Sequence, residues 1–506
     1  MDGAERRMGV GRQGSWTRGA WFPLAVAWMA GCGQAHGVDD AGAPIARDAG
    51  RDASVGSSVD SGHDAGFAED GGPPDAGAID ACVAGAEACN SLDDDCDGVV
   101  DEAGAGCMLM HASAACADGA CVVSECERDF ADCNGEAADG CEVRTGDDPA
   151  SCGTCARSCS LGVACRDGLC DDERVVRISA GYDHSCAVRA SGEALCWGLN
   201  DDGQLGTRDR VERLVATPVA GGRAFIDVVA AFDFTCGILV TGGVACWGSN
   251  LLGQLGDGRS GLSAGSLEPV DAVGPAGVVE LTAGVVGLNG SVLARTSAGD
   301  VWGWGENQHG ELGGPPPTSE PTVVTPPSLR PLAGVASIGA SNGYGCGVML
   351  DGSLECWGTR SAPVGAGARA WRSVGAGVGH RCAIAEAREL YCWGRNTGGG
   401  VGPFACTDCP SPQLLPLPEP VSSVAVGFSS TCAVLESGAP LCWGRASGSS
   451  VPSAPPGLGR TEAVSVSDWR TCALDARARV WCWQGVRVGD GTVALRDTPV
   501  EVVGLY

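Results

Sequence analysis

The sequence predicts an all-β repeat protein, and three observations carry this prediction. A short segment recurs seven times, from Cys186–Gly198 to Cys472–Gln484. In six of the seven copies two cysteines stand ten residues apart, and Trp directly follows the second. Glycine is abundant (81) and aromatic residues are few (5%), which is typical of a β protein with many turns. Self-similarity at a period of several tens of residues indicates that each repeat is one supersecondary unit.

Each copy is predicted to form a β-hairpin, because short apolar runs flank a turn. In five copies glycine, which accepts positive φ at little cost, follows the midpoint between the two cysteine positions. These glycines are Gly192, Gly242, Gly299, Gly352 and Gly438. The other two copies have Arg388 and Ala478 there, so we expect their turns to differ.

The two cysteines of each copy are predicted to form a disulfide across the hairpin. Residues equidistant from a turn lie opposite each other on antiparallel strands, with Cα atoms about 4.5–5.5 Å apart. That separation suits a disulfide. The third copy has Leu293 and Gly303 at the two positions, so both cysteines are absent together, as pairing within a repeat predicts. The predicted pairs are Cys186–Cys196, Cys236–Cys246, Cys346–Cys356, Cys382–Cys392, Cys432–Cys442 and Cys472–Cys482.

A second pattern follows the tryptophans. Asn stands three residues past the Trp in four copies, and GQLG or GELG follows at Gly203–Gly206, Gly253–Gly256 and Gly310–Gly313. This W-G-x-N-x-x-G-Q-L-G pattern resembles the repeat family named after the regulator of chromosome condensation. The resemblance covers residues 173–506 and implies a seven-bladed β-propeller there, with about 48 residues in each blade, close to known blade repeats.

The resemblance also bears on single positions and on closure of the ring. His184 and His380 occupy one repeat position that is commonly His in that family, which implies a structural role for both. The chain ends with Thr498–Tyr506, which looks like a strand preceding a repeat, yet no repeat follows. We expect this strand to pair with the first blade, because closure removes exposed sheet edges.

Residues 1–31 have the pattern of a signal peptide. A basic region precedes an apolar stretch, Ala20–Ala30, that is too short to span a bilayer. The stretch ends Met29-Ala30-Gly31-Cys32, which resembles a bacterial lipobox and implies lipid attachment at Cys32. The alternative is an ordinary secretory signal cleaved at the small residues. Gly33 after the cysteine implies passage to the outer membrane, so the expected localisation is the cell envelope.

Residues 32–81 are predicted to be a disordered acidic linker, since DAG recurs there amid Ala, Ser, Gly and Pro. Residues 82–172 are predicted to form a disulfide module, because cysteines are dense and hydrophobic periodicity is weak. This segment resembles Cys-rich modules of myxobacterial surface proteins, and its connectivity cannot be deduced from sequence. The chain holds 29 cysteines, which indicates export from a reducing cytosol.

One acidic run within this module is a candidate metal site. Asp93, Asp95, Asp97 and Asp101 fit the early positions of an EF-hand-type Ca²⁺ loop, with Gly98 at the sharp turn. Position twelve is Gly104 rather than a bidentate Glu, and Glu102 could substitute. The sequence therefore favours a structural Ca²⁺, and the alternative is a solvated acidic turn held by Cys89 and Cys96.

Two C-x-x-C pairs are assigned structural roles. Cys152 and Cys155 resemble a redox site but lack a βαβ context and stand among many other cysteines. Cys406 and Cys409 have no second pair nearby to complete a zinc site, so we predict that they staple a loop.

We find no catalytic motif in the chain: there is no nucleophile elbow, no H-E-x-x-H and no phosphate loop. The net charge of −29 argues against nucleic acid as a partner. The repeated tryptophans are predicted to be core residues, whereas Trp302, Trp371, Trp469 and Trp481 are extra and could face outward.

These observations favour a non-enzymatic, surface-anchored binding protein that uses propeller loops to recognise a protein or a glycan. A carbohydrate-active lyase or hydrolase using the central funnel is one alternative, and an inhibitor of secreted enzymes is another. Guanine-nucleotide exchange, the role of the family's founding member, is disfavoured by the expected export and the acidic charge.

Overall fold

The computed structural model describes most of the chain beyond residue 86. The described ranges are 87–94, 98–101, 106–284, 290–313, 323–330, 332–341, 343–358, 369–445, 447–467 and 469–506. The expected signal peptide, Cys32 and the linker lie outside these ranges, as do Asp95, Asp97 and Glu102. The chain divides into two compact units, Met1–Ile79 and Asp80–Tyr506, and all described residues belong to the second.

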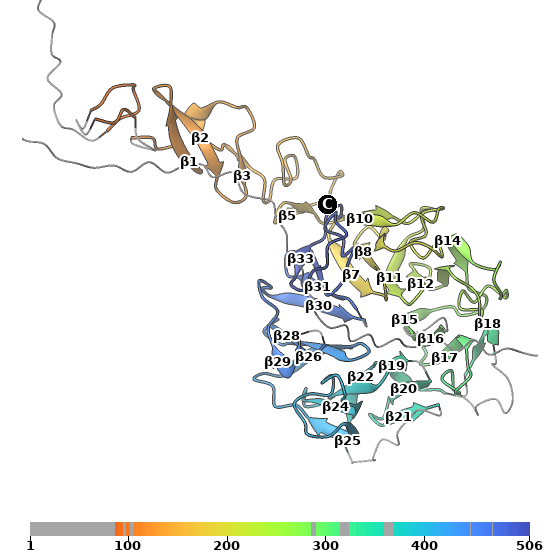
Figure 1. The fold of residues 1–506 in the computed structure, drawn as a ribbon. Helices are drawn as coiled ribbons and strands as arrows, with labels where there is room; N and C mark the ends of the chain where they lie inside the picture. The colour runs from red at the N-terminus through yellow and green to blue at the C-terminus, as the bar shows by residue number, and fades with distance from the viewer. Residues whose placement is uncertain are drawn as a thin grey trace, which may run out of the picture. The chain divides into compact units, whose positions relative to one another are not determined.

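Seven antiparallel sheets form a seven-bladed β-propeller, and Figure 1 shows them following one another around a ring. Each sheet is a meander of consecutive strands, four in every blade except blade 4, where three are described. Blade 1 comprises β7 (Val175–Ala180), β8 (His184–Arg189), β9 (Ala194–Gly198) and β10 (Arg213–Pro218). Blade 2 comprises β11 (Phe225–Ala230), β12 (Phe234–Leu239), β13 (Val244–Gly248) and β14 (Ser266–Asp271). Blade 3 comprises β15 (Val278–Ala283), β16 (Ser291–Thr296), β17 (Val301–Glu306) and β18 (Val323–Leu329). Blade 4 comprises β19 (Val335–Ser341), β20 (Tyr344–Met349) and β21 (Leu354–Trp357).

The remaining blades repeat the same order. Blade 5 comprises β22 (Trp371–Ala376), β23 (His380–Ala385), β24 (Leu390–Arg395) and β25 (Asp408–Leu414). Blade 6 comprises β26 (Val421–Val426), β27 (Ser430–Leu435), β28 (Pro440–Gly444) and β29 (Ser449–Ser453). Blade 7 comprises β30 (Thr461–Val466), β31 (Thr471–Asp475), β32 (Val480–Trp483) and β33 (Val500–Glu501). Because strands alternate in direction, the loops after the first and third strands of every blade lie on one face of the ring.

The second and third strands of each blade are the repeated hairpins, and their register places the cysteine positions opposite each other. Cys186 pairs with Cys196, and Leu293 pairs with Gly303 in the blade without cysteines. The structure contains six disulfides of this kind, each within one hairpin: Cys186–Cys196, Cys236–Cys246, Cys346–Cys356, Cys382–Cys392, Cys432–Cys442 and Cys472–Cys482. Cys406 and Cys409 also form a disulfide.

The expectation that two hairpin turns differ was wrong. Arg388 and Ala478 have φ of 61° and 67°, and Gly192 in the equivalent turn has 88°. The Arg388 N–H donates to Ala385 O (2.8 Å), as Gly192 N–H donates to Arg189 O (2.9 Å). A residue with a Cβ can be held in this conformation at a cost of about 1–2 kcal/mol, which the rest of the hairpin offsets.

The expected pairing of the C-terminal strand with blade 1 was also wrong. β33 pairs with β32, so the last strand completes the sheet of blade 7. The contacts between blades 7 and 1 include isolated hydrogen bonds rather than a strand ladder: Ala216 N–H donates to Val503 O (3.0 Å), and Ala180 N–H donates to the Ser465 hydroxyl (2.9 Å). Pairing with the nearest preceding strand satisfies the backbone of β33 without a long crossover.

The Cys-rich module forms three two-stranded sheets. Its elements are β1 (Ala112–Ala117), β2 (Ala120–Cys126), β3 (Phe130–Ala131), the 3₁₀ turn η1 (Ala137–Asp139), β4 (Val143–Arg144), β5 (Cys165–Arg166) and β6 (Leu169–Cys170). Its described disulfides are Cys89–Cys116, Cys107–Cys121, Cys126–Cys141, Cys133–Cys155, Cys152–Cys165 and Cys159–Cys170. Cys89 is therefore not bonded to Cys96, and Cys152 and Cys155 bond to different partners rather than to each other.

Blade 3 should be the least protected blade in amide hydrogen exchange, because its hairpin is the one without a bridge. Each bridge closes a short loop and contributes up to about 3 kcal/mol in the chain-entropy view. The matched variant is Leu293→Cys with Gly303→Cys, which places cysteines at the paired positions. Protection of β16 and β17 should rise in that variant. Equal protection of all seven hairpins in the wild type would contradict this expectation, and non-reducing peptide mapping tests the pairing itself.

Candidate binding face of the propeller

At five of the seams between successive blades, a tryptophan packs against a buried aliphatic residue. The aliphatic residue comes from the loop after the third strand of one blade, and the tryptophan comes from the third strand of the next. We call the aliphatic residues plug residues; they are Leu205, Leu255, Leu312, Val401 and Val488, all without exposed surface. They pack in the same clusters as Trp247, Trp304, Trp357, Trp443 and Trp197, respectively.

Hydrogen bonds reinforce these seams. The indole N–H of Trp304 donates to Gln254 O at 2.9 Å, and that of Trp443 donates to Gly400 O at 2.8 Å. Trp357 and Trp197 donate in the same way to Glu311 O and Val488 O. Trp247 has no acceptor within the described ranges, although Leu205 fills its seam. Trp197, Trp247, Trp304, Trp357 and Trp443 are therefore seam residues rather than ligand platforms.

Both histidines of the repeat belong to the same seams. His184 Nε2 lies 2.8 Å from Thr235 Oγ1, and that hydroxyl donates to Gln204 O. His380 makes the equivalent contact with Thr431 at 2.7 Å. Burial lowers the pKa of His184 to about 3 and that of His380 to about 4. Both rings are neutral at physiological pH and have no exposed surface, which leaves them no role in proton transfer to a ligand.

Four aromatic side chains lie on one face of the ring, in the loops between the first and second strands. We call Phe428, Trp469, Tyr182 and Phe232 the aromatic arc; they come from blades 6, 7, 1 and 2, which are consecutive around the ring. Phe428 is 39% exposed and Trp469 is 43% exposed. The rings of Tyr182 and Phe232 are in contact, with centroids 4.4 Å apart.

Sequence reasoning identified only one member of this arc. Trp469 does face solvent, but Trp371 is buried, and Trp302 and Trp481 are half-buried. Tyr182, Phe232 and Phe428 were missed, although each follows a small residue at the same repeat position. An alignment of the loops that follow the first strand of each blade reveals this recurrence, and it is the sequence signal that could have identified these residues.

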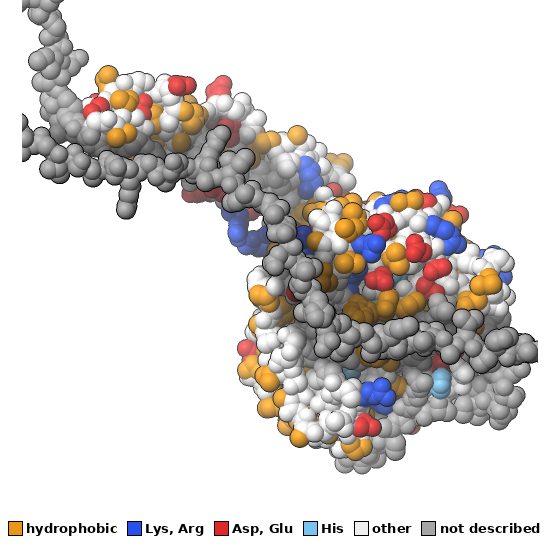
Figure 2. Space-filling view, in the orientation of Figure 1, with side chains coloured by type: hydrophobic (Ala, Val, Ile, Leu, Met, Phe, Trp, Pro, Cys, Tyr) orange, Lys and Arg blue, Asp and Glu red, His pale blue; other side chains and the backbone are white. Residues whose placement is uncertain are grey.

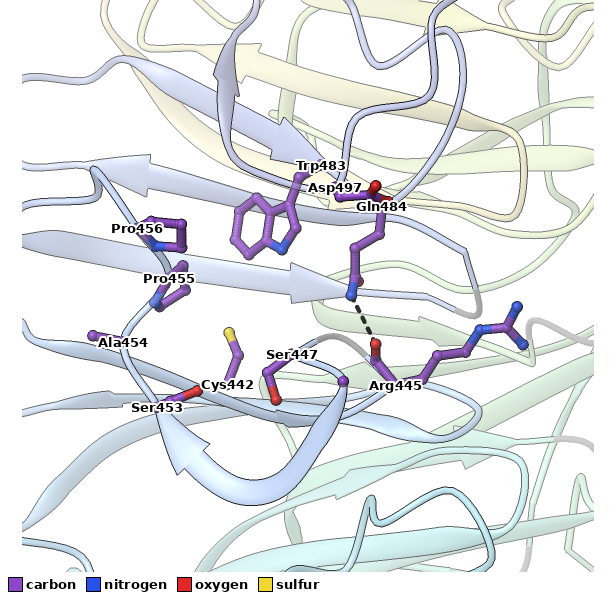
Figure 3. Close-up of a pocket in the computed structure, with 11 residues that line it drawn as sticks. Cys442, Arg445, Ser447, Ser453, Ala454, Pro455, Pro456, Trp483, Gln484 and Asp497 are labelled. Carbon is purple, nitrogen blue, oxygen red and sulfur yellow. Dashed lines mark hydrogen bonds between the residues drawn. The ribbon is translucent and has the colours of Figure 1, made fainter.

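Arg445 adds a cation to the arc. Its guanidinium carbon lies 3.4 Å from the centroid of the Trp469 ring, a cation–π contact. No acidic side chain in the described part of the chain forms an ion pair with it. Arg445 also lines two hollows beside the arc, one of 380 Å³ between blades 6 and 7 (Figure 3) and one of 540 Å³ between blades 5 and 6. Over β26, β28 and β29 the visible surface is mainly uncharged (Figure 2).

A further hollow of 500 Å³ is lined by the first strands of blades 3 to 6. Its carboxylate, Glu280, is held by Arg295 Nε (2.7 Å) and accepts bonds from Ser337 Oγ and Ile338 N–H (both 3.2 Å). A carboxylate engaged on both oxygens is poorly placed to act as an acid or a nucleophile. The hollow therefore gives less support for a catalytic function than the aromatic arc gives for a binding function.

The described part of the acidic run shows a hydrogen-bonded turn. Asp101 accepts bonds from the N–H groups of Asn90 and Ser91, and Asp93 accepts one from Gly98 N–H (3.1 Å). The three other candidate ligands lie outside the described ranges. No helix in the described ranges is long and apolar enough to cross a membrane.

The fold and its seams define a repeat propeller, and four aromatic side chains of the described residues lie on one of its faces. Residues 175–204 and 298–347 match the family model described as the regulator of chromosome condensation (RCC1) repeat. The chain thus carries RCC1 repeats, and its propeller is of the RCC1 type.

Among known proteins, the chain is similar to the ultraviolet-B receptor UVR8 of Arabidopsis thaliana, at 28% identity over 202 residues. The match covers 39% of this chain and 44% of the receptor, so it spans less than half of that relative. Yeast RCC1 (Prp20) bound to Kap60 is a similar solved structure, with 16% identity, a TM-score of 0.42, and coverage of 65% of this chain and 74% of that one. The CRINKLY WD40 ectodomain of the Arabidopsis thaliana receptor kinase ACR4 has 19% identity, a TM-score of 0.42, and coverage of 65% and 97%.

Proposed function

We propose that this protein is a non-enzymatic binding scaffold of the cell envelope, which recognises a protein or glycan ligand through the aromatic arc. The observation that carries the proposal is the placement of four aromatic side chains on consecutive blades of one face. Aromatic residues on rigid scaffolds supply large contact areas at low cost in conformational entropy. The Arg445 guanidinium beside Trp469 adds hydrogen-bonding capacity for a polar group of the ligand.

The test is capture of envelope components by the full chain and by arc variants. The chain contains no lysine, so it is immobilised through a C-terminal tag rather than through amines. Trp469→Ala with Phe428→Ala should weaken capture at least about tenfold, because hot-spot aromatics commonly contribute 2 kcal/mol or more. Leu350→Ala is the matched control, since Leu350 is 75% exposed in the turn after the second strand, on the opposite face.

Equal capture by the arc variant and the wild type would overturn the proposal. Turnover of a polysaccharide by the purified chain would replace it with the carbohydrate-active alternative. Inhibition of a secreted hydrolase that depends on Trp469 would specify the ligand as an enzyme.

Anchoring through lipid on Cys32 is part of the proposal, and it rests on the Met29–Cys32 pattern. Cys32→Ser should release the protein from membranes or block its processing. Multiple acyl chains hold a protein firmly, whereas a single chain binds only marginally. Membrane fractionation measures the effect. A correctly processed variant that stays in the membrane fraction would rule out the lipid.

A structural Ca²⁺ in the acidic run is the remaining part. It is supported by the alternation of carboxylates from Asp93 and by the turn at Gly98, whose φ is 93°. Ca²⁺ should protect residues 89–102 from proteolysis, and Asp95→Ala with Asp97→Ala should abolish that protection. The absence of calorimetric binding at millimolar Ca²⁺ would favour the solvated turn.

A further inference from the structure

The seam between blades 6 and 7 lacks the plug residue that fills the other described seams. In blades 1, 2, 3 and 5 the plug residue stands eight positions after the repeated Trp. In blade 6 that position is Val451, which lies in β29 and is 56% exposed. β28 ends at Gly444 and β29 begins at Ser449, so the connecting loop turns back at once and carries no Leu or Val. The hydrophobic cluster around Trp483 contains no residue of this loop.

The unfilled seam is the 380 Å³ cavity of Figure 3. Trp483 lines it from blade 7, and Pro455, Pro456 and Cys442 line it from the side of blade 6. Gln484 and Ser447 add polar groups, and Arg445 and Asp497 add charged ones. Its volume lies in the range of small ligand sites and accommodates a Leu side chain together with adjoining backbone.

Two hydrogen-bonding groups of this seam, the Trp483 indole and the Thr471 hydroxyl, do not donate to a loop carbonyl among the described residues. The Trp483 indole N–H has no acceptor among the described residues; four of its counterparts donate to a loop carbonyl, whereas Trp247 and Trp393 have no acceptor there either. Thr235 and Thr431 also donate to a loop carbonyl, but the equivalent Thr471 donates to Gln484 Oε1 at 2.8 Å.

The side chain of Gln484 supplies one hydrogen-bond acceptor that a loop carbonyl supplies in other blades. Its φ is 62°, at the position where the other six repeats have Gly. Its Nε2 donates to Arg445 O at 3.1 Å (Figure 3), which directs its amide across the seam. Gln484 thus satisfies Thr471 but leaves the Trp483 N–H and the apolar walls uncovered.

We propose that a peptide segment of a partner protein completes this seam, inserting a Leu or Val side chain beside Trp483. The carbonyl preceding that residue would accept the Trp483 N–H, as Gln254 O accepts the Trp304 N–H. The chemistry of the occupant comes from this molecule itself, since five seams show an aliphatic side chain in that place. This inference rests on the proposed function and specifies its ligand as a protein. Arg445 borders both the cavity and Trp469, so the bound segment continues onto the aromatic arc.

A labelled peptide with the sequence of Asn250–Asp257, which contains the plug residue of blade 2, is the probe. Fluorescence anisotropy with the full chain should detect binding. The same peptide with Leu255→Asp should bind at least about tenfold more weakly, because a carboxylate would replace the aliphatic side chain beside Trp483 in a cavity that Asp497 also lines. In the protein, Trp483→Phe keeps an aromatic ring but removes the N–H donor and should weaken binding about three- to tenfold. Leu350→Ala should leave it unchanged.

A loop graft provides the second arm. Replacing residues 445–448 with residues 249–265 of blade 2 supplies a plug in cis, so peptide binding should disappear and the unfolding midpoint should rise. If the graft does not fold, Ser453→Trp at the exposed rim of the cavity obstructs entry and should also abolish binding.

The inference is overturned if both peptides bind equally or if neither binds below about 5 mM, a free energy of only about 3 kcal/mol. In that case, envelope capture that depends on Trp469 would leave the proposed function standing. Leu-dependent peptide binding without Trp469-dependent capture would instead support the seam site and reject the arc.

Discussion

Trp304→Ala should lower the free energy of unfolding by about 3–5 kcal/mol. The side chain has no exposed surface and packs with Leu255 and Phe234 in the seam between blades 2 and 3. Truncation of a buried Trp loses its transfer free energy and leaves a cavity. It also leaves the Gln254 carbonyl without the indole donor, which adds about 1 kcal/mol. Chemical denaturation with disulfides intact measures the difference through the midpoint.

Trp469→Ala is the control for this prediction. Trp469 lies on the aromatic face and is 43% exposed, so its loss should change stability by less than about 1 kcal/mol. If Trp304→Ala were as mild as Trp469→Ala, the seams would not be the main source of cohesion between blades.

Acidification from pH 7 to pH 3.5 should destabilise the protein by several kcal/mol through His184 and His380. Burial lowers the pKa of both imidazoles, to about 3 and about 4, whereas unfolded histidine titrates near 6.5. The unfolded chain therefore binds more protons between these values, and stability falls as pH falls through 6.5. Each site contributes on the order of 3–5 kcal/mol at the acid limit.

The double variant His184→Gln with His380→Gln isolates this effect, because Gln retains a donor near Nε2 but does not titrate in this range. Its stability should vary less between pH 7 and pH 3.5 than that of the wild type. Asp233, whose pKa burial raises to about 6, acts in the opposite sense and is common to both proteins. His111→Gln is the matched control, since His111 is only partly buried and its ring nitrogen lies 2.9 Å from Glu127. A double variant as acid-sensitive as the wild type would refute the assignment.

The hairpins were predictable because their determinants are local. A spacing of ten residues across a turn places Cys186 opposite Cys196, and the joint replacement by Leu293 and Gly303 fits the same register. The blade count follows from counting repeats. The candidate binding face was harder to predict from the sequence. Trp469 stood out as an extra aromatic, but recognising the arc required knowing that the first loops of blades 6, 7, 1 and 2 are neighbours.

Local patterns in the sequence thus specified the number of repeats, the register of each hairpin and the positions of the paired cysteines. Contacts between distant residues specified the rest. Arg388 and Ala478 adopt the glycine-like turn because the surrounding hairpin holds them there. β33 joins blade 7 because the outer edge of β32, which pairs with β31 on its other side, is the nearest edge along the chain. The open seam beside Trp483 could be identified only from the tertiary structure, in which the short loop of blade 6 lies against blade 7. A cavity is the space that the side chains on both of its sides leave unfilled, so neither segment predicts it alone.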